Sequence, residues 1–595
     1  MLACLLNSVL SLVRRPPSAV RRLPAVLLCA LLLASCSSPL SAEPTRTPGA
    51  IPVVTVFATP VPPVPPTATP LPTATPVPVK TIAIAPDIPA KMRESLAQDL
   101  RDWAASKPLP QVDLQVSDGA AGDVTIGMTQ AGGTPIITRT YAVVAPFPTV
   151  ADAITFTEFA ALWQGDDQAV SDFIVADAGP IVFVDAATRD DMVRLMGQPG
   201  TTVQVVTSTD LISQTWAGRP TALAVVPFDE LDARWKLLHV NGINLFEREA
   251  DMAAYPLNLR VTATGDAALI GAMMNGISST LAALSNRDLS KMAVVAMTGV
   301  TALVRGTAVM MEQKGITYPG QMIQGWLATA DIAHISNEVS FWDDCPPPTF
   351  NDGVSMCSNP KYIELLKYVG TDVIELTGNH LWDKGVRFLS GTIQTYKNLG
   401  WGYFGGGLDI KDAMKPLTMT VNGNRIAFIG CNWFGEDWAT DEYAGSAPCS
   451  TNDPRDLTDI SAEIGQLKSE GYLVIATLQY AEFYDYGATI QQAIDFDQLR
   501  SAGAVVVNGS QGHHAQGFDV NAQGFLHYGT GNLFFGDQSG DGTHQTFVDR
   551  HVFYNGRYLG VDLRTAFIRD NSQPQPMTPE ERADLLRLLF KVSGY

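Results

Sequence analysis

Short apolar runs that end in polar clusters recur through the second half of the chain, and this pattern constrains the fold more than any other feature. The stretches DVIELTGNHLWDKG, YLVIATLQYAE and AGAVVVNGSQGHH each begin like a buried strand and end in Gly, Asn, His, Gln or Glu. Runs of this length, separated by helical stretches, predict an α/β fold. Because open α/β sheets place their sites beyond the carboxyl ends of the strands, we expect these clusters to line one crevice.

Histidine is distributed unevenly in the same way. Of the eight His residues, only His239 lies before residue 290, and the others follow it (His334, His380, His513, His514, His527, His544 and His551). Oxygen and imidazole donors at separate strand ends are the ligand types that a divalent metal needs. The alternative at any one position is a turn that holds a hydrogen-bonded histidine, so the prediction of a polar site rests on the several clusters together.

Length and charge limit the class of protein and its partners. The chain has 595 residues, of which 46% are hydrophobic and 17% charged, and its length predicts two or more domains. A formal net charge of -20 leaves no basic surplus to neutralise a phosphate backbone, so we expect no nucleic acid partner. A net charge does not reveal local basic patches, and an anionic polymer therefore stays open as a ligand.

The N-terminus carries the features of an export signal. Arg pairs at positions 14–15 and 21–22 precede the apolar run LPAVLLCALLLASC, which is too short for a transmembrane helix and suits a signal-peptide core. The ending LASC resembles the lipobox of bacterial lipoproteins, in which the Cys is acylated. We therefore expect residues 1–35 to be a signal peptide and Cys36 to anchor the exported protein by lipid on the outer face of the cell membrane. The alternative is a plain secretory signal.

Cysteine usage agrees with export. Of the seven Cys, Cys4 and Cys29 lie in the signal and Cys36 carries the predicted lipid, which leaves an even number in two locally spaced pairs. Metal binding is the rival use for these residues, but the chain has no C-x-x-C spacing. We expect two disulfides, Cys345–Cys357 and Cys431–Cys449.

Two segments precede the histidine-rich half. Residues 36–80 are rich in Pro and Thr, which predicts an extended polyproline-type spacer. Short apolar runs alternate with helical stretches from there on, which predicts an α/β domain over 81–285. Its stretches YAVVAPFPTVADAITFTEFAALWQG and TALAVVPFDELDARWKLLHVNGIN resemble halves of the bacterial periplasmic binding protein fold. A ligand-binding cleft and a structural spacer are both open as roles for this domain.

Four motifs in the second half together resemble a known family. ISNEVSF, TGNHLWDKG, NGSQGHHAQGF and HYGTGNLFF, in this order, are similar to motifs of the CapA-type capsule or poly-gamma-glutamate synthesis proteins, over about residues 291–570. The fold of that family is similar to that of calcineurin-like metallophosphoesterases. The resemblance therefore implies a C-terminal domain over 288–595, folded as a four-layer α/β/β/α sandwich.

The resemblance also implies roles for single residues at the strand ends. Acid or base catalysis would fall to His380 and Asp383. The ligands of a divalent Mn, Zn or Mg ion would be Glu338, Asn379, His380 and His514. Substrate contact, or support of these groups, would come from Asn337, Gln479, Glu482, His513 and Asn532.

Three departures from the family pattern indicate an incomplete metal site. The family's opening Gly-Asp reads Gly299-Val300 here, so a carboxylate ligand is missing. The His-Trp-Gly-x-Glu segment reads QYAE, with Glu482 shifted by one, and the last His of the Gly-His-x-x-His pattern is Gln516. A complete two-metal centre is not expected from these residues.

Two functions of different class follow. In the first, the protein is a metal-dependent hydrolase that is phosphoesterase-like or processes a gamma-glutamyl polymer. In the second, the crevice has lost its metal and binds an anionic envelope polymer without catalysis. In both, the resemblance implies a role in capsule or poly-gamma-glutamate synthesis or export, at the membrane and beside other polymer-synthesis proteins.

Overall fold

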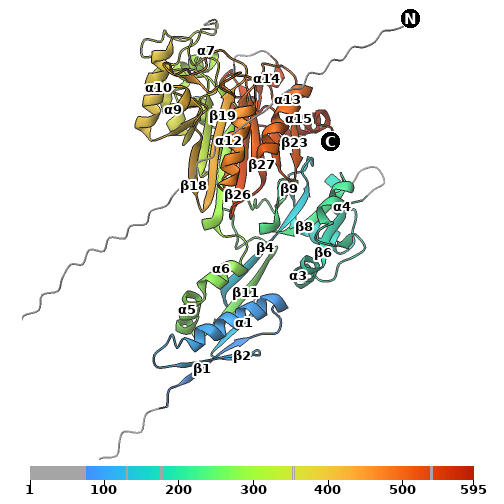
Figure 1. The fold of residues 1–595 in the computed structure, drawn as a ribbon. Coiled ribbons are helices and arrows are strands. Elements are labelled where there is room, and N and C mark those ends of the chain that lie inside the picture. Colours follow the sequence, from blue (N-terminus) through green and yellow to red (C-terminus); the bar gives the residue numbers. More distant parts are fainter. Residues whose placement is uncertain (1–75, 129–131, 174–178, 352, 354, 537–539) are drawn as a thin grey trace, which may run out of the picture. The chain divides into compact units, whose positions relative to one another are not determined.

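The fold is described from a computed structural model of the chain (Figure 1). It describes residues 76–128, 132–173, 179–351, 353, 355–536 and 540–595. The residues from Thr75 to Tyr595 group into one compact unit. The predicted signal peptide, the lipid attachment at Cys36 and most of the predicted spacer lie outside the described residues.

A mixed sheet forms the N-terminal part of the described chain, with strand order β2-β1-β3-β11-β4-β8-β6-β7 and β9 paired to β4. Its strands are β1 (Val79–Ile84), β2 (Asp113–Asp118), β3 (Val124–Met128), β4 (Thr134–Pro146), β6 (Ile181–Asp185), β7 (Val203–Val206), β8 (Ala222–Pro227), β9 (Trp235–Leu237) and β11 (Asn258–Gly265). The short strands β5 (Ala153–Ile154) and β10 (His239–Val240) pair with each other. The helices are α1 (Ala90–Ala105), α2 (Phe156–Trp163), α3 (Ala186–Met196), α4 (Leu211–Ala217), α5 (Ala267–Gly276) and α6 (Ser278–Leu284).

Two apolar cores lie along this sheet, and β4 and β11 contribute to both. Ile137 of β4 and Val261 of β11 pack in a core with α1, α5 and α6, whereas Val143 and Leu259 of the same strands pack in a core with α2 and α3. Strand β4 is 13 residues long, which lets one element pass from one core to the other. Among the described residues no single helix is long and apolar enough to cross a membrane, and the helices α5 and α6, bent by 79°, meet that test only as a pair.

Two larger sheets form the C-terminal part. One has the order β16-β15-β14-β12-β26-β27-β28 with β13 and β25 beside it, and the other has the order β18-β19-β21-β22-β24-β23. The strands of the first are β12 (Met292–Thr298), β13 (Val300–Thr301), β14 (Ile332–Asn337), β15 (Val373–Glu375), β16 (Gly402–Phe404), β25 (Asn532–Phe534), β26 (Gln545–Tyr554), β27 (Arg557–Arg569) and β28 (Gln573–Pro576). Those of the second are β18 (Leu417–Val421), β19 (Asn424–Asn432), β21 (Leu473–Gln479), β22 (Ala504–Ser510), β23 (Phe518–Asn521) and β24 (Gly524–His527).

Helices accompany both sheets. The short strands β17 (Gly406–Gly407) and β20 (Gly445–Ser446) pair with each other. The α-helices of this part are α7 (Arg305–Lys314), α8 (Gln324–Ala328), α9 (Ile363–Tyr368), α10 (Val386–Leu399), α11 (Ile410–Ala413), α12 (Thr458–Ser469), α13 (Ile490–Ala502), α14 (Asp541–His544) and α15 (Pro579–Val592). The mixed α/β class with several sheets that the sequence predicted is confirmed (Figure 1).

Alternation along the strands explains how these sheets pack. Ile475 of β21 lies in a core shared with Val295 of β12 from the other sheet, whereas its neighbours Val474 and Ala476 pack against α12 and α13. Successive side chains of a strand point to opposite faces, so one apolar run can fill two cores. A third core places the other face of the first sheet against α7, α8, α9 and α10.

Local sequence signals fix several of the element ends. The β26–β27 hairpin turns at Asn555-Gly556 and the β18–β19 hairpin at Asn422-Gly423, and all four residues have positive φ. Asn-Gly is the pair that tolerates this two-residue turn best. Helix α15 begins with a capping box between Thr578 and Glu581.

Both predicted disulfides are present, and that prediction is confirmed. Cys345 bonds to Cys357 with an S–S distance of 2.05 Å, and Cys431 bonds to Cys449 with a distance of 2.08 Å. The first closes a loop that follows β14, so it acts directly on the chain beside the strand ends.

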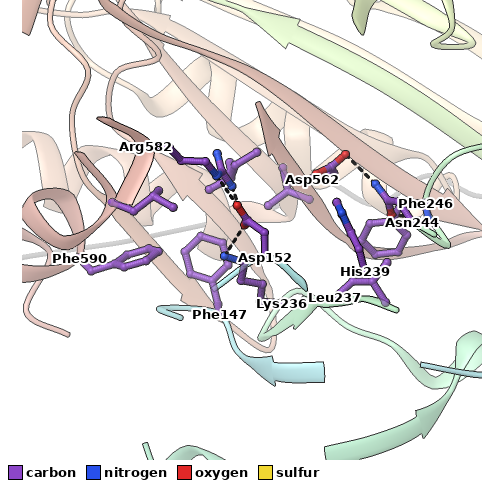
Figure 2. Close-up of a pocket in the computed structure, with 13 residues that line it drawn as sticks. Phe147, Asp152, Lys236, Leu237, His239, Asn244, Phe246, Asp562, Arg582 and Phe590 are labelled. Carbon is purple, nitrogen blue, oxygen red and sulfur yellow. Dashed lines mark hydrogen bonds and ion pairs between the residues drawn. The ribbon is translucent and has the colours of Figure 1, made fainter. Parts of the chain in front are cut away.

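The N-terminal part meets β27 and α15 through charged side chains around a small pocket (Figure 2). Asp152 lies between two cations, with Lys236 Nζ 2.8 Å from its Oδ1 and Arg582 Nε 2.5 Å from its Oδ2. Asn244 Nδ2 donates to Asp562 Oδ2 over 3.0 Å. The pocket has a volume of about 20 Å³, which is room for about one water molecule, so the two surfaces pack closely here.

Candidate functional site

Carboxyl ends of parallel strands from both C-terminal sheets meet in one polar group of side chains. Strands β14 and β15 run parallel in one sheet, and β19, β21 and β22 run parallel in the other. Hydrogen bonds between the side chains at these ends join the two sheets. We call the four residues involved the strand-end cluster: Glu338, Asn379, Gln479 and Gln511.

Gln479 is the centre of the strand-end cluster. Its Nε2 lies 2.6 Å from Glu338 Oε1 and 3.0 Å from Asn379 Oδ1, and it also donates to Gln511 Oε1. Gln479 is 0% exposed, and Glu338 and Gln511 are 1% exposed. The carboxamide nitrogen therefore contacts oxygens from three other strand ends at a point that solvent does not reach.

Backbone packing holds Glu338 close to the loop after β15. A Cβ atom placed on Gly378 would lie 2.6 Å from the Cα of Glu338, which is closer than atoms can approach. Only Gly fits at this position, so the loop of the TGNH motif can lie directly against the end of β14. This contact brings Asn379 within reach of the Gln479 amide.

His380 and Asp383 form a pair at the edge of the cluster. Nδ1 of His380 lies 2.9 Å from Oδ2 of Asp383, and the side chains are 23% and 16% exposed. The same Asp383 oxygen accepts from the backbone N of Met356 over 2.6 Å, which ties it to the disulfide-closed loop. Burial alone lowers the pKa of His380, but the bond to Asp383 and the charge of Glu338 outweigh it and raise this pKa.

A further carboxylate lies near this pair. Asp437, in the loop after β19, accepts from the backbone N of Trp382 over 3.2 Å. Burial, together with the charge of Asp383, raises the pKa of Asp437 to about 6. Sequence analysis did not identify this residue, because it follows its strand at a distance and no motif marks it.

His513 and Asn532 form a second pair. His513 Nδ1 lies 2.8 Å from Asn532 Oδ1, and Asn532 Nδ2 donates to the carbonyl of Thr543 over 3.0 Å. Tyr484 stacks on the His513 ring at a centroid distance of 6.2 Å. The exposed Glu482, which lies with Tyr484 in the loop after β21, accepts from the hydroxyl of Tyr484.

His514 and Asn337 are held by other neighbours. The ring of His514 packs edge-on against Tyr486 at 4.5 Å and covers Gly542, and burial lowers its pKa. Asn337 is fully buried, and its Nδ2 donates to the Tyr396 hydroxyl over 2.9 Å. These contacts tie both residues to the surrounding scaffold.

Two of the three positions at which the sequence departs from the family pattern, Val300 and Gln516, have scaffold contacts as well. Val300 lies in a small apolar cluster with Val304, Met356 and other buried residues. Gln516 Oε1 accepts from Gln492 Nε2 over 3.0 Å. Neither position offers a carboxylate or an imidazole.

The donor set does not fit the divalent metal that the family resemblance implies. Within the described ranges, no group of three or more His, Cys, Asp or Glu side chains could hold a metal ion. Three oxygens that could serve as ligands instead converge on the Gln479 amide nitrogen. We therefore derive no chemical step through a metal.

Sequence analysis identified Gln479 but not its partner Gln511. Gln511 lies inside the motif NGSQGHH, two residues before the His pair, and the prediction of a site from this motif rested on those histidines. Its role is visible only once β22 is placed beside β21, because its side chain reaches across the strand ends.

The fold and the site define a class of protein: a mixed α/β chain with a buried polar cluster where the strand ends of two sheets meet. Residues 293–537 match the family described as bacterial capsule synthesis protein PGA_cap, and this segment is of that family. The capsule biosynthesis protein CapA of Bacillus anthracis is 26% identical over 315 residues, which cover 52% of this chain and 75% of the relative. The strand-end cluster lies within both the matched segment and the quoted motifs.

Solved structures similar to part of the chain include an ABC-type transport receptor and the regulatory domain of a LysR family regulator. An ABC-type phosphate transport receptor from Vibrio cholerae aligns with 34% of this chain and 96% of its own, at 14% identity and a TM-score of 0.26. PstS from Borrelia burgdorferi aligns with 34% of this chain and 97% of its own, at 11% identity and a TM-score of 0.27.

Proposed function

We propose that this protein acts outside the cytoplasm in the synthesis or export of a capsule polymer, with poly-gamma-glutamate or another anionic polymer as its ligand. The match of residues 293–537 to the PGA_cap family and the similarity to a capsule biosynthesis protein support this. The observation that carries the proposal is that all four residues of the strand-end cluster lie inside the matched segment.

The proposal includes a fold assignment for the C-terminal part. We propose a four-layer α/β/β/α sandwich of the metallophosphoesterase type. Its support is the packing: one core lies between the two sheets, one joins the first sheet to α7–α10, and one joins the second sheet to α12 and α13.

We further propose that the protein is tethered to the outer face of the cell membrane by lipid on Cys36 and works beside other polymer-synthesis proteins. Two disulfides and the lipobox-like LASC support export. The full chain should fractionate with membranes, and a Cys36→Ala variant should be released. Identical fractionation of the two would contradict lipid anchoring.

A pocket beside His380 and Asp383 is where we place polymer contact. It has a volume of about 130 Å³ and is lined by Met356 and other residues of the disulfide-closed loop, and by residues outside that loop such as Lys384. Lys384 Nζ donates to Ser355 Oγ over 2.9 Å. A second cation, Arg305, lies close enough for its charge to lower the pKa of His380, against the larger effects that raise it. Apolar lining with cations beside it suits a chain of methylenes and carboxylates, despite the net negative charge of the protein.

Hydrolysis is the second candidate function, and one observation favours it. His380 is held in one orientation by Asp383 and is partly exposed, and the pKa of the nearby Asp437 is about 6. A histidine and a carboxyl whose pKa values are both raised by their surroundings can act as acid and base. Binding without catalysis is the better supported function, because the strand-end cluster is closed by its own hydrogen bonds.

The test uses fluorescently labelled poly-gamma-glutamate and the full chain at low and high salt. Lys384→Ala should weaken binding about tenfold at low salt, because a partly exposed cation–carboxylate contact, which salt screens, is lost. The control Lys367→Ala removes a surface Lys that pairs with Glu364 on α9, and it should bind like the wild type. No binding by the wild type, or equal loss in both variants, would contradict the proposal. Shortening of the polymer that is abolished by His380→Ala would establish the hydrolase.

A further inference from the structure

Three oxygens converge on one nitrogen in the strand-end cluster. Nε2 of Gln479 lies 2.6 Å from Glu338 Oε1 and 3.0 Å from Asn379 Oδ1, and it also contacts Gln511 Oε1. A carboxamide nitrogen carries only two hydrogens, so it cannot give all three oxygens a full hydrogen bond. The cluster therefore contains more acceptors than this donor can satisfy.

A fourth oxygen adds to the surplus. Oε1 of Gln479 itself is buried and has no hydrogen-bond partner among the described residues. The acceptors come from four separate strand ends, and one of them is a carboxylate at 1% exposure. Oxygen atoms that crowd one buried point normally do so around a cation, because only positive charge offsets their mutual repulsion.

We infer that the carboxamide of Gln479 takes the place of a cation among the oxygens of Glu338, Asn379 and Gln511, so that the strand ends are held together without a bound metal. The two amide hydrogens supply the positive partial charge that the site requires. This inference rests on the proposed function and deepens it, because it makes polymer binding at the neighbouring pocket independent of divalent metal.

The decisive variant is Gln479→Glu. It keeps the length of the side chain but removes both hydrogens and adds a second carboxylate, so the same oxygens should now demand a cation. In EDTA the variant should melt at a lower temperature than the wild type, and added Mn²⁺ or Ca²⁺ should raise its melting temperature. The wild type should show no such dependence, and the variant should bind Mn²⁺ at least about tenfold more tightly in a titration followed by electron paramagnetic resonance.

Gln492→Glu is a matched control. Gln492 is also buried, and its Nε2 donates to Gln516 Oε1 and to the carbonyl of Tyr528, each over 3.0 Å. Both acceptors are uncharged. This variant should lose stability as well, but metal should not restore it.

Three outcomes would overturn the inference. One is a wild type that takes up one Mn²⁺ ion per chain. Another is a folded Gln479→Glu variant whose melting temperature does not change when metal is added. The third is a Gln492→Glu variant whose melting temperature is restored by added metal. If Gln479→Glu does not fold, Gln479→Ser provides a second variant, because it removes the amide from the same point without adding charge. Added metal should raise its melting temperature less than that of a folded Gln479→Glu variant. The Mn²⁺ titration of the wild type remains decisive in either case. Polymer binding by the wild type in EDTA tests the proposed function separately, because it can fail while the metal results stand.

Discussion

Arg582 on α15 donates two hydrogen bonds to Asp152, which lies 430 positions earlier in the chain: from Nε to Oδ2 over 2.5 Å and from Nη2 to Oδ1 over 2.9 Å. Lys236 approaches the same carboxylate at 2.8 Å (Figure 2). Burial on its own raises the pKa of Asp152, but the two cations outweigh it and lower this pKa well below its ordinary value. The contact joins the N-terminal part of the described chain to its C-terminal part.

Removing the two hydrogen bonds from Arg582 to Asp152 should destabilise the fold. Arg582→Ala should lower the free energy of unfolding by about 2 kcal/mol, because a partly buried carboxylate loses its bidentate partner while Lys236 remains. Urea unfolding followed by fluorescence measures the change. Arg587→Ala on the same helix is the control: its pair with Asp584 has exposed fractions of 63% and 81%, so the change should stay under about 0.5 kcal/mol. If Arg582→Ala and Arg587→Ala lowered the free energy of unfolding by the same amount, the contact between Arg582 and Asp152 would contribute little to stability.

The pH dependence of stability should carry the signature of His380. Its pKa in the folded protein is raised above the ordinary value of 6.5, so its contribution is present at low pH and is lost as the pH rises through the folded pKa. Asp383→Asn should lower the pKa of His380, because burial then dominates. Histidine NMR titration measures it. Asp412→Asn, which removes a carboxylate bonded to the Tyr403 hydroxyl, should leave the pKa of His380 unchanged. An unchanged pKa in Asp383→Asn would refute this account of His380.

The disulfide beside the strand ends should act on the same histidine. The double change Cys345→Ser with Cys357→Ser should lower the free energy of unfolding by about 3 kcal/mol, as expected for a short closed loop. It should also lower the pKa of His380, because the Met356 backbone N that holds Asp383 belongs to that loop. The corresponding change at Cys431 and Cys449 should cost similar stability but move the pKa of His380 less, because the loop that this disulfide closes holds Asp437 and not the Met356 backbone N that bonds to Asp383. Equal shifts in the two variants, or no shift in either, would contradict the proposed link.

Local signals in the sequence were sufficient to place the strand ends. The runs DVIEL, YLVIATL and AGAVVV correspond to β15, β21 and β22, because apolar runs of this length fill the buried faces of parallel strands. The contact between Gln479 and Glu338 could not be predicted, since the two residues lie 141 positions apart in different sheets. Their meeting depends on how the sheets pack, and no local pattern encodes that packing. The scaffold contacts of His514 are unpredictable for the same reason.

Gly378 offers the sharpest test of how tightly the strand ends are packed. Gly378→Ala should lower the free energy of unfolding by about 3 kcal/mol, because the added Cβ would lie 2.6 Å from the Cα of Glu338 and 2.9 Å from its Cβ, and backbone atoms cannot give way cheaply. Gly391→Ala is the matched control within α10, where an added Cβ meets nothing within 4 Å. There the better helix propensity of Ala should stabilise the protein by about 0.5–1 kcal/mol. Thermal and urea unfolding of both variants measure the difference. A neutral Gly378→Ala would mean that the loop of the TGNH motif does not lie against the end of β14, and the position of Asn379 beside Gln479 would then have no structural cause.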